Sequence, residues 1–223
     1  KKFSEKISHK YKINFNDDFT KLYNWSTRNP ENFWKEFWDY SQIIGSKGDE
    51  VITKNKIFYK NLFFKNSKLN FTENLLFKSN DDIAIYSLKE GGINEKITWK
   101  QLRENVCKIS YFLKKIGLNK NDRVAGYVPN TIESVESFLA VAKNGYIWSS
   151  CSPDFGIQGL VDRFKQIDPK VLFTCDYYFY NGKKINILDR IPEILKEIPK
   201  IKKVIVFNYI YFFSIIKIII TSN

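Results

Sequence analysis

The middle of the chain, from Ile97 to Phe173, shows the most regular pattern of hydrophobic and polar positions. Short apolar runs alternate there with segments whose apolar residues recur at every third or fourth position, which is the spacing of an amphipathic helix. The runs predict strands, and the spaced segments predict helices. Strands are expected at 124–128, 146–149 and 171–174, and helices at 102–116, 131–142 and 157–167. Strands that alternate with helices of this length predict an α/β fold with a parallel sheet.

Capping residues mark the ends of these predicted helices. Thr98 with Gln101 three positions later has the form of a capping box, and Gly117 is suited to the C-terminal cap of the same helix. Asn130 or Thr131 can cap the second helix. The segment Ser152 to Gly156 separates a strand from the third helix and is expected to be a loop.

The first 80 residues show a weaker order. Residues 1–22 are polar and lysine-rich and indicate no element. Residues 22–44 show helical spacing with an aromatic stripe formed by Phe33, Trp34, Phe37 and Trp38. Asn29-Pro30-Glu31 reads as a helix start, and residues 45–48 are expected to end this helical element. Packing onto a larger body is the simplest role for the stripe. The segment 63–76 predicts an extended stretch that runs into a short helix.

Further elements are expected on both sides of the central region. Residues 83–86 predict a strand followed by a turn at Gly91-Gly92, 176–184 a loop, 188–198 a helix and 203–207 a strand. We therefore expect a helical N-terminal element at 1–80, an incomplete α/β domain at 81–208 and an apolar tail at 209–223. The stretch from Val204 to Ile220 is slightly short and too polar for a membrane span. A frameshift or read-through, a truncated gene model and a membrane anchor are the alternatives for the tail.

Composition narrows the function classes. The formal charge of +12 comes almost entirely from lysine, and no basic run or nucleic-acid motif is present, so we expect no nucleic-acid partner. Three widely spaced cysteines predict neither disulfides nor a zinc site and favour a reduced, cytoplasmic setting. A single histidine, His9, supports no metal site and no catalytic pair. Since there is no initiator methionine, we expect the natural start to lie upstream. The first residues also show no signal-peptide pattern.

Two stretches resemble a known family. Asp122 to Asn130 (DRVAGYVPN) resembles a strand and turn of the adenylate-forming enzymes. Gly145 to Gly156 (GYIWSSCSPDFG), which continues into Asp162 to Lys170 (DRFKQIDPK), is similar to the acetoacetyl-CoA synthetases within that superfamily. Upstream, Leu69 to Leu76 (LNFTENLL) is also similar to these enzymes. The resemblance extends from about residue 15 to about residue 209.

The resemblance implies the fold and the chemistry. It implies a helical N-terminal element followed by the first βα units of the N-terminal domain of an adenylate-forming enzyme. Such enzymes use ATP and Mg²⁺ to activate a carboxylate, here acetoacetate, and then transfer the acyl group to CoA. The Ser/Thr/Gly-rich loop that would hold the ATP phosphates is not in this sequence, so we expect no catalytic residue here, no metal ligand and no adenylation by this portion alone. The missing C-terminal remainder would be a partner, and a non-catalytic module that binds CoA or a protein is the alternative.

The resemblance also suggests where CoA would bind. Lys183 lies where relatives carry a basic residue that meets the CoA 3′-phosphate, and Tyr180 replaces another such residue. Asp154, Phe155 and Gly156 align with a turn that lines the pantetheine tunnel. Each has a plainer interpretation: Lys183 as a solvated surface lysine, and the turn as a loop in which Asp154 supports the following helix. Cys151 has no basic neighbour in the sequence and is expected to be structural.

Overall fold

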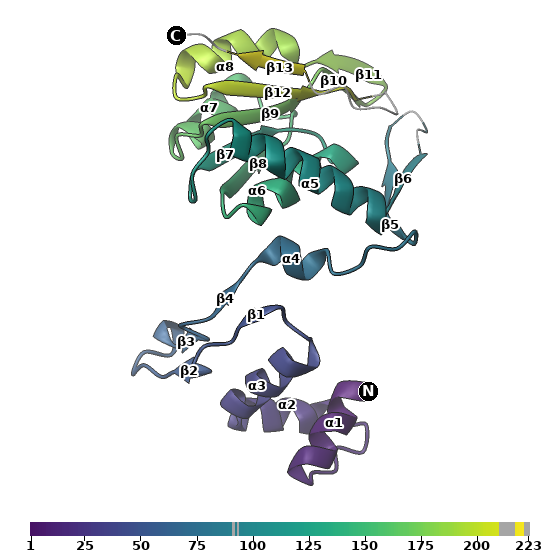
Figure 1. The fold of residues 1–223 in the computed structure, drawn as a ribbon, viewed down its shortest axis with the longest axis vertical. Coiled ribbons are helices and arrows are strands. Elements are labelled where there is room, and N and C mark those ends of the chain that lie inside the picture. Colours follow the sequence, from purple (N-terminus) through teal and green to yellow (C-terminus); the bar gives the residue numbers. More distant parts are fainter. Residues whose placement is uncertain (91, 93, 210–216, 221–223) are drawn as a thin grey trace. The chain divides into compact units, whose positions relative to one another are not determined.

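The structure is a computed structural model that describes residues 1–90, 92, 94–209 and 217–220. The chain forms two compact units, Lys1–Asn74 and Leu75–Asn223. Figure 1 labels the helices and strands of both units.

Three helices dominate the first unit: α1 (Lys2–Tyr11), α2 (Phe19–Arg28) and α3 (Pro30–Tyr40). The predicted helix start at Asn29-Pro30-Glu31 is confirmed, because Asn29 is the N-cap residue of α3 and Pro30 lies in its first turn. The preceding part of the predicted helical stretch belongs to α2. Helix α1 was not predicted, because its polar residues conceal a buried Ile7 and a Phe3 ring that packs edge-on against Phe33 at 5.7 Å. The aromatic stripe therefore binds a helix that the local pattern did not indicate.

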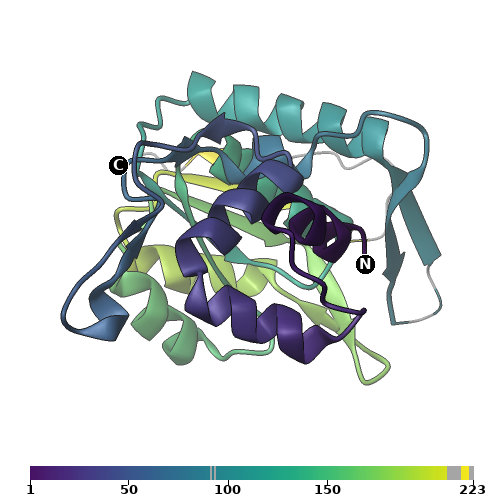
Figure 2. The same ribbon diagram turned by 90° about the horizontal axis from the view of Figure 1, so that it is seen from below.

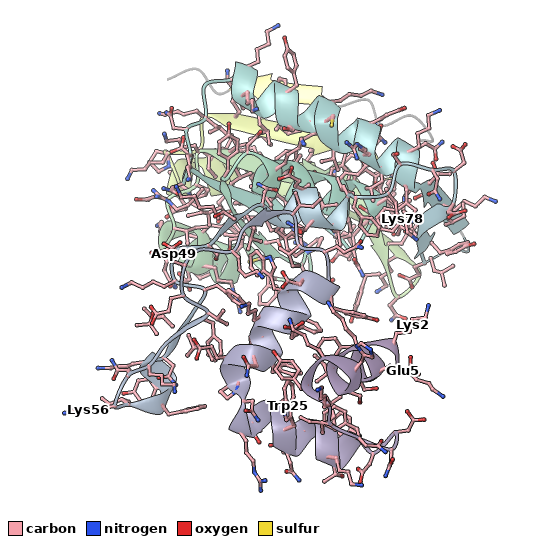
Figure 3. All side chains as sticks on the ribbon, turned by 60° about the horizontal axis from the view of Figure 1, so that its bottom comes forward. Lys2, Glu5, Trp25, Asp49, Lys56 and Lys78 are labelled. Atoms are coloured by element: carbon pink, nitrogen blue, oxygen red, sulfur yellow. The ribbon has the colours of Figure 1, made fainter. Side chains whose placement is uncertain are left out.

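Ion pairs and rings hold these helices together. The carboxylate of Glu36 is buried on α3 and accepts a hydrogen bond of 2.5 Å from Lys10 on α1. Trp25 on α2, labelled in Figure 3, packs against Tyr11 with ring centroids 5.0 Å apart. The buried carboxylate is compensated by the lysine, as a charge removed from water requires.

Short elements complete the first unit. β1 (Gly45–Ser46) pairs with β4 (Lys68–Leu69), and β2 (Ile52–Thr53) pairs with β3 (Leu62–Phe63), both antiparallel. The 3₁₀ turn η1 (Phe58–Lys60) lies between β2 and β3, and α4 (Phe71–Leu75) follows β4. The predicted extended stretch and short helix at 63–76 are confirmed, whereas Gly45-Ser46, expected only to end a helix, forms a strand.

The second unit begins with a hairpin and a long helix. β5 (Ile83–Leu88) pairs with β6 (Asn94–Thr98), and α5 (Trp99–Lys115) follows. Thr98 and Gln101 form the predicted capping box, and Gly117 adopts a φ of 84° directly after the C-cap residue Ile116. At the predicted turn, Gly91 lies outside the described residues, and Gly92 donates a backbone hydrogen bond to Lys89.

A five-stranded sheet forms the core of the second unit, in the order β13-β12-β9-β7-β8. β7, β8, β9 and β12 are parallel and β13 is antiparallel. The strands span Arg123–Tyr127 (β7), Ile147–Cys151 (β8), Val171–Cys175 (β9), Lys203–Phe207 (β12) and Lys217–Ile220 (β13). The crossover helices span Ile132–Lys143 (α6), Ile157–Lys165 (α7) and Ile191–Glu197 (α8).

Helices cover both faces of this sheet. α5 packs on α6 along one face, and α7 packs on α8 along the other (Figure 2). The fully buried strand β9, whose five residues are all inaccessible to solvent, lies between these layers. The predicted α/β fold with a parallel sheet is confirmed.

One prediction for this unit is wrong. Residues 176–184, expected to be a loop, contain β10 (Tyr177–Tyr180), which forms a hairpin with β11 (Lys183–Asn186). Asn181 and Gly182 both have positive φ angles, 50° and 72°, as a two-residue hairpin turn requires. The predicted helix at 188–198 begins with a 3₁₀ turn, η2 (Leu188–Arg190), before α8.

Residues 210–216 and 221–223 of the expected apolar tail lie outside the described residues, and 217–220 form β13. Across the part of the chain that the structure describes, no helix has the length and apolar character that a membrane span needs.

Candidate functional site

The candidate residues gather at the carboxyl ends of the parallel strands. The turn Ser152–Gly156 follows β8, the β10–β11 hairpin follows β9, and Tyr127 is the last residue of β7. Strand β8 lies on one side of β7, and β9 and β12 lie on the other, so the strand order reverses at this position. In open α/β sheets, ligands bind at such reversals, outside the carboxyl ends of the strands.

The turn after β8 is ordered by its own side chains. The Ser152 hydroxyl donates a hydrogen bond of 2.7 Å to Asp154. The Phe155 ring lies under the guanidinium of Arg163, 4.5 Å from its centre. Gly156 is the N-cap residue of α7, and no side chain makes a capping hydrogen bond there. Asp154 therefore forms a hydrogen bond within the turn, and it is not the N-cap residue of α7.

The hairpin after β9 brings the two groups of predicted residues together. Tyr180 pairs directly with Lys183 across the hairpin, and Tyr178 lies two positions before Tyr180, so all three share one face. The Tyr178 hydroxyl donates a hydrogen bond of 2.7 Å to the carboxylate of Asp154. Tyr180 and Lys183 are themselves exposed. The structure thus joins the Asp154 turn to the Lys183 hairpin through Tyr178.

Neighbouring segments hold the hairpin. Its turn is anchored at Gly182, whose backbone N–H donates a hydrogen bond of 2.7 Å to the carboxylate of Glu90. The carboxylate of Asp176 accepts the backbone N–H groups of Tyr177 and Tyr209, at 2.8 and 2.9 Å, which ties the base of the hairpin to the end of β12. Hydrogen bonds from Glu90 and Asp176 therefore hold the hairpin that carries Lys183.

Tyr127 and Arg190 also belong to this site, and the sequence did not single them out for it. The Tyr127 side chain is completely buried, and burial raises the pKa of its phenol. Arg190 donates to the Tyr127 hydroxyl and, over 2.9 Å, to the Pro153 carbonyl. Two signals were available: a tyrosine at the end of a buried strand needs a partner for its hydroxyl, and arginine is rare in this lysine-rich chain.

A pocket of about 370 Å³ lies beside the turn. Trp148 and Cys151 from β8, Asn130 from the β7–α6 loop and Phe138 from α6 are among its lining residues. The Trp148 ring also crosses Gly126 on β7, where an added Cβ would come within 2.5 Å of it. Only glycine permits this approach, so Gly126 allows Trp148 to form one wall of the pocket.

The cysteines fit a structural role. Cys151 is buried, and burial raises the pKa of its thiol, as it does for Cys175, so both thiols are held in the unreactive form. Cys107 is exposed. The described residues contain no cluster of three or more His, Cys, Asp or Glu side chains suited to a metal ion.

Comparison with known proteins places this chain in a family. The profile of the family described as AMP-binding enzyme matches residues 73–215, which include β7, the turn and the hairpin. The chain belongs to the AMP-binding enzyme family. It is 46% identical over 201 residues to the acetoacetyl-CoA synthetase of Gallus gallus, covering 88% of this chain and 30% of that protein.

Two further similarities refine the comparison. A solved structure of the acetoacetyl-CoA synthetase from Streptomyces lividans matches with a TM-score of 0.86 at 30% identity, over 92% of this chain and 32% of the other. Malonamoyl-CoA synthetase vrtB of Penicillium aethiopicum is 37% identical over 212 residues, covering 92% of this chain and 29% of that protein. The chain thus spans about 30% of the length of the curated relatives it matches. Relatives that are named for different acyl groups are similar to it in sequence.

Proposed function

We propose that this chain forms part of an acetoacetate–CoA ligase, which converts acetoacetate, ATP and CoA to acetoacetyl-CoA, AMP and diphosphate. The support is the similarity to acetoacetyl-CoA synthetases over most of the chain. One structural observation supports a role for this chain in binding CoA: the hydrogen bond from Tyr178 to Asp154 joins the two segments that the family resemblance assigns to CoA.

We propose that the joined segments contribute to the CoA site. Lys183, which is exposed, would meet the 3′-phosphate as a point charge, with the exposed Tyr180 paired to it across the hairpin. Asp154, Phe155 and Gly156 would line the path of the pantetheine arm. The carboxylate of Asp154 is engaged by Ser152 and Tyr178, which directs it into the protein's own hydrogen bonds.

ATP and Mg²⁺ do not fit the residues of this sequence. Charge that develops on diphosphate must be met by backbone N–H groups and cations, and the sequence contains no Ser/Thr/Gly-rich loop that ends in Pro-Lys. We therefore expect this chain by itself to bind CoA without forming an acyl-adenylate. The alternative function is a non-catalytic module that binds CoA or a protein partner.

Binding of CoA and of 3′-dephospho-CoA, measured by isothermal titration calorimetry, tests the proposed site. The unaltered chain should bind CoA more tightly, on the order of tenfold, because a hydrogen bond between charged groups contributes about 1.5 kcal/mol. Lys183→Ala should remove this difference and leave affinity for 3′-dephospho-CoA unchanged. Lys196→Ala, which removes an exposed lysine on α8, is the matched control. Equal affinities of the unaltered chain for both ligands would contradict the assignment of Lys183.

The activity is tested on the polypeptide that the source cells make. An antibody against residues 148–170 identifies that polypeptide, and its mass shows whether it exceeds the 26.4 kDa of this chain. A larger species should release AMP when given acetoacetate, ATP and CoA. A species of 26.4 kDa that binds CoA without releasing AMP would favour the non-catalytic module.

A further inference from the structure

The side chains of Tyr127 and Arg190 hold the main chain of the turn after β8. The Tyr127 hydroxyl lies 3.0 Å from the Pro153 carbonyl and 2.9 Å from the Phe155 carbonyl. Arg190 donates to that hydroxyl and to the Pro153 carbonyl. Two carbonyls of the turn are thus fixed by a strand residue and by a residue 37 positions beyond Pro153.

These contacts depend on one another. Tyr127 is completely buried at the end of β7, and the hydroxyl of a buried tyrosine costs free energy unless it is hydrogen-bonded. Its oxygen accepts from Arg190, which leaves its proton for a carbonyl of the turn. The 3₁₀ turn η2 delivers Arg190 to this position directly before α8. Loss of either side chain would leave the other, and the turn carbonyls, with fewer partners.

We propose that Tyr127 and Arg190 are positioning residues that fix the turn Ser152–Gly156 in the form that receives the pantetheine arm of CoA. This inference rests on the proposed function for the identity of the ligand. The fixing of the turn itself is independent of any ligand, because all of its contacts lie within the chain. The two parts are therefore tested separately.

Three variants separate the contacts. Tyr127→Phe keeps the ring and removes only the hydroxyl, Arg190→Ala removes the guanidinium, and Arg190→Lys keeps a cation that can still donate to the Pro153 carbonyl. Lys196→Ala again provides a control from the same part of the chain.

Cysteine alkylation reports on the turn without a ligand. Cys151 is buried directly before Ser152, Cys175 is buried in β9, and Cys107 is exposed, so each thiol has its own environment. Iodoacetamide labelling, followed residue by residue with mass spectrometry, should show rapid labelling of Cys107 and slow labelling of the other two. Tyr127→Phe and Arg190→Ala should raise the rate at Cys151 on the order of tenfold while Cys175 remains slow, and Arg190→Lys should restore part of the protection.

Two results would overturn this part of the proposal. An unchanged Cys151 rate in Tyr127→Phe and Arg190→Ala would mean that neither side chain fixes the turn. An equal rise at Cys151 and Cys175 in all three variants would mean that the side chains hold the whole sheet and have no particular role at the turn.

Ligand binding tests the second part. Adenosine 3′,5′-bisphosphate carries the nucleotide phosphate but no pantetheine arm. Its affinity should therefore depend on the hairpin and not on the turn. Arg190→Ala should weaken the binding of CoA at least fivefold and change the affinity for the bisphosphate by less than twofold. A general loss of structure would weaken the binding of both ligands. Equal weakening of both ligands would overturn the pantetheine role. If the unaltered chain binds neither ligand, the proposed function and the pantetheine role fail together, and the labelling rates still decide whether the two residues fix the turn.

Discussion

The phenol of Tyr178 donates a hydrogen bond of 2.7 Å to the carboxylate of Asp154, 24 residues earlier in the chain. Tyr178 belongs to the hairpin that follows β9, and Asp154 belongs to the turn that follows β8. Strands β8 and β9 are not neighbours, since β7 lies between them. This hydrogen bond therefore links two loops across the middle strand, directly above the carboxyl ends of the sheet.

Removing this hydrogen bond should loosen the link without disturbing the sheet. We expect Tyr178→Phe to lower the free energy of unfolding by about 2 kcal/mol, because hydrogen bonds to charged groups contribute about that much. Urea denaturation measures the loss. Asp154→Asn gives the second side of a double-mutant cycle, and additive losses in the double variant would contradict the direct link.

Gly126→Ala should destabilise the second unit. A Cβ at this position would lie 2.5 and 2.6 Å from two atoms of the Trp148 ring, so the indole must move within a packed layer. Overpacking of this kind costs about 1 to 3 kcal/mol, measurable by thermal or urea unfolding together with a change in tryptophan fluorescence. Gly159→Ala on α7 is the matched control, because the nearest atom to its Cβ would be 3.6 Å away. Gly92 is unsuitable, because its φ of 80° would strain an alanine without any close contact. Equal stability of Gly126→Ala and the unaltered chain would contradict the close approach.

Glu136 should make stability depend on pH near neutrality. Burial raises the pKa of this carboxyl group from 4.5 to about 7, and Glu133 on the same helix adds to the increase, whereas hydrogen bonding by Asn105 and the charge of Lys108 oppose it. The folded state then holds the proton more tightly than the unfolded state does, so stability is highest below pH 4.5 for this group and falls as the pH rises towards 7.

The variant Glu136→Gln isolates that contribution. Its amide oxygen can still accept from Asn105, 2.8 Å away in the native protein, and it does not titrate. Between pH 5 and pH 8 the unaltered chain should lose roughly 2 to 3 kcal/mol relative to Glu136→Gln. Urea unfolding at a series of pH values gives both curves, and parallel curves would show that Glu136 has the same pKa in the folded and unfolded states.

Lys89 should stabilise the junction of the β5–β6 hairpin with the end of β12. Its ammonium group is buried, 2.7 Å from the carboxylate of Glu95 and 2.9 Å from the Tyr209 carbonyl. Lys89→Met leaves Glu95 without its cation, and we expect a loss of about 3 kcal/mol in urea unfolding, since breaking a buried ion pair exposes the full desolvation cost of the remaining charge. The double variant Lys89→Met/Glu95→Gln removes that charge and should recover part of the loss. A double variant less stable than Lys89→Met would argue against a buried, uncompensated Glu95.

The elements that local patterns predicted are those whose causes are local. Thr98 and Gln101 form a capping box with each other, and the apolar spacing of α5 indicates a helix wherever it packs. Helix α1 was missed because Phe3 and Ile7 become core residues only when α3 lies against them. The β10–β11 hairpin was missed although Asn181-Gly182 is a local signal for a two-residue hairpin turn. Its anchors, Glu90 and Asp176, lie outside the hairpin, and only the fold shows that they hold its turn and base.

The sequence by itself determined the parallel α/β arrangement, the main caps and the family resemblance, because periodicity, capping and motifs are carried by residues close together along the chain. It also indicated Asp154 and Lys183 as separate candidates. Only the tertiary structure decided that Tyr178 joins them and that Tyr127 and Arg190 support the turn that contains Asp154. These contacts arise where parallel strands bring the ends of distant segments to one edge of the sheet, and no spacing along the chain encodes that proximity.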